Sequence, residues 1–196
     1  MSERPTMCDR YLAKLRSRPR ELCPVPQRIY GWRWRTSPDL SAMQACLRDI
    51  VSLLEAMEDE GRLLAGPTGA VDSRPELPHY SNLSIAFNGW DHQAADPFRF
   101  PGWILRNGEP PANFCDTQAK AYDDAVVACL CIATMHFPAK VLHVWSDVEG
   151  KDALWGVMLF RSLFERSSYR PFWDDTTENA QVVTLDPQVE SADGQA

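Results

Sequence analysis

The first clear pattern of hydrophobic and polar positions predicts a helix from Pro38 to Gly61. Ser37 is a candidate N-cap, Pro38 suits a first turn and Gly61 suits a helix end. The apolar residues on one side of this helix recur every three or four positions: Leu40, Met43, Leu47, Ile50, Val51, Leu54 and Met57.

A second helix is predicted to begin near Asp116 or Thr117 and to end at Pro138. Its apolar residues cover most sides of the helix, which is typical of a central, buried helix. A third helix is predicted from Asp152 to Arg166.

Alternating positions predict the strands. In Arg28–Arg35 one face would carry Tyr30, Trp32 and Trp34, and the other Ile29, Arg33 and Arg35. Further strands are predicted over Tyr80–Phe87, within Phe98–Arg106 and over Val141–Trp145.

The resulting order is strand, helix, strand, strand, helix, strand, helix. It predicts a single α+β domain with a ferredoxin-like split βαβ arrangement and an extra C-terminal helix. An irregular two-layer α/β sandwich is the alternative. The domain would span residues 28–173, after a basic Pro/Arg-rich segment (residues 1–27) and before a flexible acidic tail (residues 174–196). Within the basic segment, residues 9–18 are compatible with a short helix.

Charge divides the chain unevenly. Residues 1–35 carry a net charge of +6 and the remainder −13, against −7 for the whole chain. An acidic body repels nucleic acid and fits a protein partner with a basic surface. The N-terminus has no apolar signal region, so a cytoplasmic protein is expected, and in that compartment the six cysteines are expected to be reduced.

Few residues carry recognisable chemistry. No phosphate-binding loop, nucleophile elbow or zinc-protease motif occurs, and neither a metal nor a cofactor is expected. His79 begins one of the two His-x-Ser/Thr motifs that a 2H phosphoesterase needs, and no second one follows. Asp91 and His92 form the best remaining acid/base pair. Asp123 and Asp124 are adjacent on a helix and are expected to form a solvated patch.

Tryptophan is in excess, with seven residues in the chain. About half are expected in the core and the rest at a contact surface. Since aromatic and arginine side chains dominate protein interfaces and also stack on bases, a partner-binding surface is predicted. Its candidate residues are Trp32, Arg33, Trp34, Arg35, Trp90 and Asp91.

Five short motifs carry a resemblance to a known group: Phe87-Asn88-Gly89, Phe114-Cys115-Asp116-Thr117, Tyr122-Asp123, His136-Phe137 and Ser146-Asp147. In their spacing they resemble small uncharacterised accessory proteins of tailed bacteriophages and prophages, over about residues 81–165. This chain differs from that pattern at Asp116, where a lysine is frequent, and at Val148, where a glycine is frequent. The resemblance implies a phage accessory gene product and brings no catalytic residues.

The expected function is therefore non-enzymatic. The protein would bind and inhibit a bacterial host protein complex, for example one with a basic nucleic-acid-binding surface, and an anti-CRISPR-type antagonist of host defence is the most concrete form. The alternatives are a nucleic-acid-binding protein that uses Arg28 together with the Trp32–Arg35 segment, and a nucleotide-degrading phosphoesterase around His79, Asp91 and His92.

Overall fold

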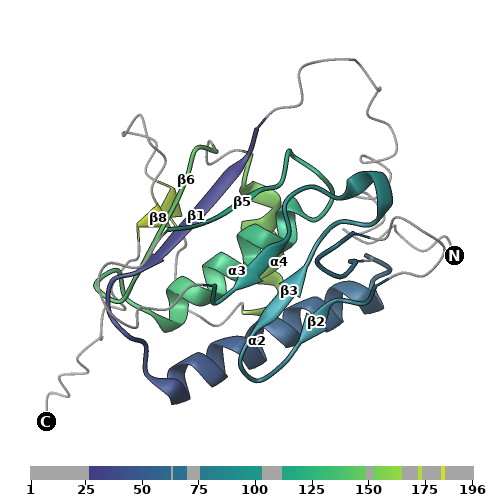
Figure 1. Cartoon of the computed structure of the whole chain (residues 1–196). Coiled ribbons are helices and arrows are strands. Elements are labelled where there is room, and N and C mark those ends of the chain that lie inside the picture. The colour runs from purple at the N-terminus through teal and green to yellow at the C-terminus, as the bar shows by residue number, and fades with distance from the viewer. Residues whose placement is uncertain are drawn as a thin grey trace, which may run out of the picture.

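The computed structural model describes residues 27–62, 64–69, 76–102, 112–148, 152–164, 172–173 and 182–183. The predicted N-terminal helix, most of the predicted acidic tail, and Cys8, Cys23 and Trp103 lie outside these ranges. The described part is α+β, as predicted, with helices packed on antiparallel strands (Figure 1).

The first sheet has β1 (Ile29–Trp34) at its centre, between β5 (Asn113–Asp116) and β6 (Leu142–Ser146). Both neighbours are antiparallel to β1, so β5 and β6 run parallel to each other. The helix α3 (Asp123–His136) connects them, and β1 lies between them, which makes a split βαβ unit. The full ferredoxin-like arrangement is not confirmed, because other described strands pair in a sheet of their own.

That second sheet consists of β2 (His79–Tyr80), β3 (Ile85–Phe87) and β4 (Phe98–Phe100). The single strand predicted over residues 80–87 is wrong, because the chain reverses between β2 and β3. The Ser81 hydroxyl accepts hydrogen bonds from the backbone N–H groups of Leu83 (3.2 Å) and Ser84 (2.9 Å) and so stabilises the turn. A further described pair is β7 (Phe172–Trp173) with β8 (Val182–Val183).

The two three-stranded sheets meet where β4 lies near β5. The backbone N–H of Asp96 donates to the carbonyl of Asp116 at 3.2 Å. At the other end of β4, a Cβ added to Gly102 would lie 2.3 Å from the side-chain oxygen of Asn113. The aromatic side chains of β4 consequently reach the core beneath the first sheet.

The helix α2 (Leu40–Asp59) confirms the first predicted helix. Its N-cap is Asp39 rather than Ser37, since the Asp39 carboxylate accepts the N–H of Ala42 at 3.0 Å. The apolar stripe is buried at Met43, Cys46, Leu47, Ile50, Leu53, Leu54 and Met57.

The predicted start of the second helix is wrong by about six residues. Asn113–Asp116 form β5, and the following turn holds Gln118 and Ala119 at φ values of 52° and 54°. Residues in this left-handed region do not continue a right-handed helix. The helix that does form, α3, is buried on nearly all sides, as predicted.

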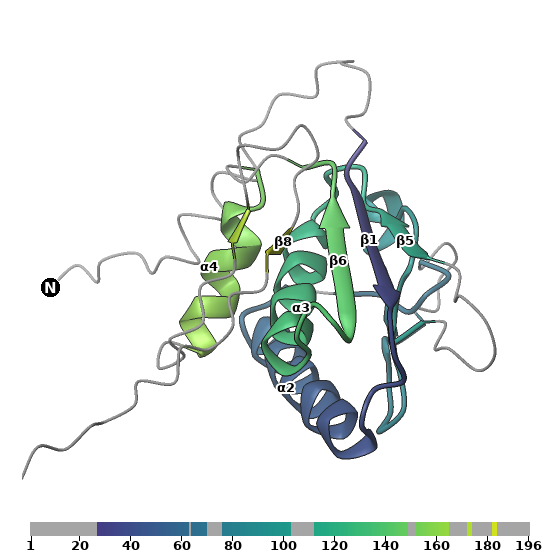
Figure 2. The ribbon, with the colours of Figure 1, turned by 90° about the vertical axis from the view of Figure 1, so that its left-hand side faces the viewer.

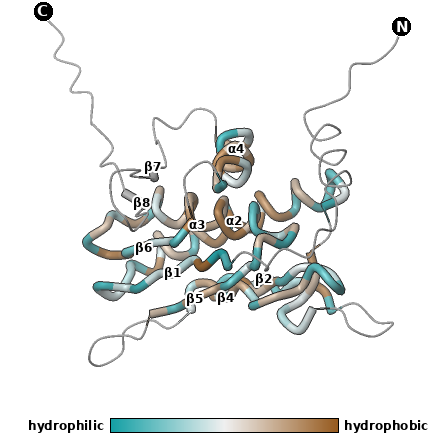
Figure 3. The backbone as a smooth tube through the Cα atoms, turned by 90° about the horizontal axis from the view of Figure 1, so that it is seen from above, coloured by the Kyte–Doolittle hydropathy of each residue, from teal (hydrophilic) through white to brown (hydrophobic). Residues whose placement is uncertain are grey.

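The helix α4 (Leu154–Leu163) packs on α3, where Gly156 permits close approach. A Cβ at Gly156 would lie 2.4 Å from the Cβ of Val127. The helices α2, α3 and α4 lie on one side of the two three-stranded sheets, with α4 outermost (Figures 2 and 3). The opposite side of the first sheet carries no described helix.

Candidate functional site

Trp32 and Trp34 belong to the core and not to a contact surface. They share one face of β1, as predicted, but that face lies against the helices, and the two side chains are 1% and 0% exposed. Both indole N–H groups donate to the carbonyl of Pro101, at 3.0 Å and 2.9 Å. This burial corrects the prediction that Trp32 and Trp34 bind a partner, because neither indole reaches the surface.

The other side of the first sheet presents a different set of residues, which we call the outer face: Gly31, Arg33, Phe114, His143 and Trp145. The strand register places Gly31 opposite both Phe114 and Trp145, and Arg33 opposite His143. Because side chains alternate along a strand, the four side chains of this set point away from the helices, and Gly31 adds none. Phe114 is 57% exposed, which is unusual for a phenylalanine.

The aromatic rings of the outer face are held in a defined arrangement. The indole of Trp145 lies against Gly31, where an added Cβ would come within 2.3 Å of the ring. Phe114 meets Trp145 edge-on, with ring centroids 5.7 Å apart and an interplanar angle of 83°. His143 stacks on Trp145 at 5.2 Å and 26°. The missing side chain of Gly31 thus lets rings from β5 and β6 meet across β1 in one aromatic row.

One end of this row is basic. Arg33 and Arg35 are exposed, and no carboxylate in the described ranges forms an ion pair with either. The pKa of His143 is lowered, first by burial and then by the positive charges of Arg35 and Arg33. The neutral imidazole is favoured accordingly, and the two guanidinium groups supply a positive charge that none of the described carboxylates pairs with.

Trp90 and Asp91 lie on a separate loop between β3 and β4, where both are exposed. Asn88 organises this loop from within the protein. Its side-chain oxygen accepts the N–H groups of Gly89 (2.8 Å) and Ala95 (3.1 Å), and its amide donates to the carbonyl of Ala95 at 2.9 Å.

In the same loop, Asp91 begins the short 3-10 helix η1 (Asp91–Gln93) at a φ of 49°. Its carboxylate lies 3.3 Å from the His92 imidazole, and hydrogen bonds from His92 lower the pKa of Asp91. Both side chains are more than 60% exposed, so the pair lacks the enclosed setting in which an acid/base pair is tuned.

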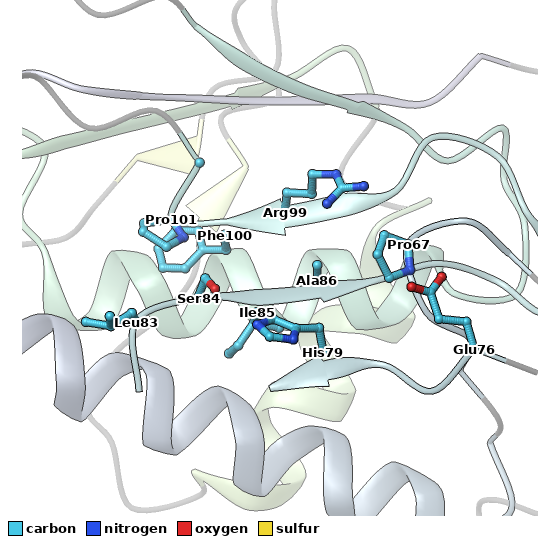
Figure 4. A pocket seen from close by; sticks show the side chains of 11 residues that line it. Pro67, Glu76, His79, Leu83, Ser84, Ile85, Ala86, Arg99, Phe100 and Pro101 are labelled. Atoms are coloured by element: carbon cyan, nitrogen blue, oxygen red, sulfur yellow. The ribbon is translucent and has the colours of Figure 1, made fainter. Parts of the chain in front are cut away.

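An open cavity of about 1000 Å³ lies over the second sheet (Figure 4). The strand register places Ala86 between His79 and Arg99, so the small central side chain forms its floor. Glu76 stands at the wall, where Thr68 donates to its carboxylate from both N–H (2.9 Å) and hydroxyl (2.5 Å) and lowers its pKa. Neither Asp91 nor His92 lines this cavity, so the residues of the phosphoesterase hypothesis are not brought together.

Tyr122 and Asp123, which form one of the short motifs, stabilise the fold at the start of α3. Asp123 forms an ion pair with Arg28 at 2.6 Å and accepts the Thr117 hydroxyl. The Tyr122 hydroxyl donates to the carbonyl of Asp96 at 2.6 Å and so ties α3 to the approach to β4.

The expected solvated patch at Asp123 and Asp124 is wrong. The two residues are 4% and 7% exposed, because α3 is surrounded by other elements. Burial raises the pKa of Asp124 to about 7.

Sequence reasoning placed Arg33 and Arg35 on the surface and missed the aromatic residues beside them. His143 and Trp145 alternate in a predicted strand, which was the available signal. Phe114 gave none, because no strand was predicted directly before the second helix.

The described residues contain no group of three or more His, Cys, Asp or Glu side chains that could hold a metal ion. None of the described helices has both the length and the apolar composition needed to span a bilayer. Comparison of the chain with protein-family models, curated proteins and solved structures finds no match.

Proposed function

We propose that this protein is a binding protein that docks on a bacterial host protein complex through its outer face and inhibits that complex. The observation that carries the proposal is the ordered row of the exposed Phe114 and the half-buried Trp145 beside Arg33 and Arg35. Tryptophan and arginine supply most of the energetically dominant contacts of protein interfaces. A row that is ordered before binding also reduces the conformational entropy lost on association.

The biological form of the proposal is a phage or prophage accessory protein acting in the host cytoplasm, with an anti-CRISPR-type inhibitor as the most concrete case. It is supported by the motif spacing over about residues 81–165 and by the net charge of −7, which favours the approach of a target that is basic overall, while Arg33 and Arg35 themselves contact an acidic part of that target. The ferredoxin-like arrangement is part of the same proposal, and the β5–α3–β6 unit around β1 supports it.

A pull-down from bacterial hosts tests this function. The tagged protein is compared with the double variant Arg33→Glu/Arg35→Glu and with Arg48→Glu, an exposed arginine on α2 that serves as a matched control. We expect one stoichiometric host partner with the native protein and the control, and its loss with the double variant. Recovery of the partner by all three proteins would refute the role of the outer face, and recovery of none in several hosts would refute the function.

A second candidate function is the binding of single-stranded nucleic acid on the same face. Arginines beside an aromatic row favour it, since bases stack on aromatic rings and arginine contacts phosphate. Of the residues first considered for this role, only Arg33 and Arg35 are suitable, because Arg28 pairs with Asp123 and both tryptophans are buried. Salt-dependent binding of an oligonucleotide, lost in Arg33→Glu/Arg35→Glu, would favour this candidate.

A further inference from the structure

The charge of the surface changes sign from one end of β1 to the other. Arg33 lies near the C-terminal end of this strand, and Arg35 directly follows the strand. At its N-terminal end Ile29 is paired with Asp116, and the carboxylate of Asp147 accepts the N–H of Ile29 at 2.7 Å. Asp147 is exposed and Asp116 is half-buried. With a rise of about 3.3 Å per residue, the two charged ends are roughly 13–20 Å apart.

Between these ends the surface is apolar and aromatic. Gly31 adds no side chain, and Phe114 and Trp145 flank it on the neighbouring strands. The protein therefore presents three zones in the order basic, aromatic and acidic along a single strand.

We infer that the outer face binds a short segment of a protein that is acidic over Arg33 and Arg35, apolar over Phe114 and Trp145, and basic toward Asp116 and Asp147. This inference rests on the proposed function and specifies the chemistry of the partner. An extended segment of about five to seven residues spans the three zones. The charges at the two ends fix its direction, because the reversed segment brings like charges together.

A nucleic-acid strand matches this face less well than a protein segment does. Its phosphates are uniformly negative. A nucleic acid that lies along β1 therefore gains contacts at Arg33 and Arg35 but is repelled at Asp116 and Asp147. A protein segment satisfies both ends.

A second copy of this chain also has complementary ends but requires more area. A patch that is five residues long and three strands wide covers roughly 17 by 14 Å, or about 240 Å². A stable interface buries about 800 Å² on each partner. The area fits a single docked segment.

Four defined probes test the inference. Three are nine-residue peptides with the same apolar centre and with charged ends that are acidic and basic, both acidic, or both basic. The fourth is a 12-nucleotide oligo(dT). Binding to the full chain is followed at low salt by NMR, from the backbone amides of Phe114 and Gly31 and the indole N–H of Trp145.

We expect the peptide with opposite ends to bind about fivefold more tightly than either uniformly charged peptide, and more tightly than oligo(dT). In Arg33→Glu/Arg35→Glu, both ends of the face are acidic, so the preference is expected to change to the peptide with two basic ends. Arg48→Glu, the control on α2, is expected to keep the native order of affinities.

Several results would overturn the inference. They are equal affinity for the three peptides, tighter binding of oligo(dT), no shifts with the peptide of opposite ends at millimolar concentration, and concentration-dependent shifts at Phe114 and Trp145 from self-association alone. The pull-down separates this inference from the proposed function. If the host partner is lost with Arg33→Glu/Arg35→Glu while the peptides show no charge preference, the function stands and the segment chemistry is wrong.

Discussion

Replacement of Gly31 by alanine should disturb the outer face without a change in the core. The new Cβ would lie 2.3, 2.5 and 2.7 Å from three atoms of the Trp145 indole, all below the 3.0 Å that real Cβ contacts respect. The ring has to move by about 1 Å to reach ordinary contact. Trp145 is only half-buried, so it turns outward rather than straining the sheet.

The cost follows from the contacts that this movement breaks. Trp145 loses its ring contacts with Phe114 and His143, each worth about 0.5–1.5 kcal/mol. Alanine is better than glycine inside a strand by about 0.5–1 kcal/mol, which offsets part of the loss. We expect Gly31→Ala to lower the free energy of unfolding by about 1 kcal/mol.

A double-mutant cycle isolates the collision. In a Trp145→Ala background no indole opposes the new Cβ, so Gly31→Ala should instead stabilise the protein by about 0.5–1 kcal/mol. The free energies come from urea unfolding followed by far-UV circular dichroism. As a control, Gly61→Ala has no atom within 4 Å of the new Cβ and should cost the same in both backgrounds, through its φ of 78° alone. An equal loss from Gly31→Ala in both backgrounds would refute the reasoning.

Three further predictions concern charged groups. Asp123→Ala leaves the Arg28 guanidinium without its buried partner and should lower the free energy of unfolding by about 3 kcal/mol in urea titrations. The Asp124 carboxyl is neutral in the folded protein below its pKa of about 7, whereas in the unfolded chain it ionises above about pH 4. Between about pH 4 and about pH 7 the free energy of unfolding should therefore fall by about 1.4 kcal/mol per pH unit. Asp124→Asn should remove that decline. Arg35→Gln removes a charge that lowers the pKa of His143, so an NMR titration of the imidazole should show a higher pKa.

Each of these has a contrary outcome. If Asp123→Ala lowers the free energy of unfolding by less than about 1 kcal/mol, the ion pair between Arg28 and Asp123 is not held in solution. An unchanged pH dependence in Asp124→Asn would exclude that carboxyl as its source. If Arg48→Gln, the control on α2, raises the pKa of His143 as much as Arg35→Gln does, the effect is not local.

Periodicity alone determined α2, the buried character of α3 and the two faces of β1. These features depend on the spacing of apolar residues along a continuous segment, and that spacing is visible in the chain. The turn at Ser81 and the strand β5 were missed because neither depends on the spacing of apolar residues. A hydrogen bond to the Ser81 side chain stabilises the chain reversal between β2 and β3, and pairing with β1 makes Asn113–Asp116 a strand.

The candidate site was only half predictable. Alternation separated Arg33 and Arg35 from Trp32 and Trp34, but it does not state which face of a strand meets the helices. Tertiary packing decided that the tryptophans are core. It also brought Phe114, Gly31 and Trp145 into one row from three separate strands, because strand register is set by pairing across the sheet and not by neighbours in sequence.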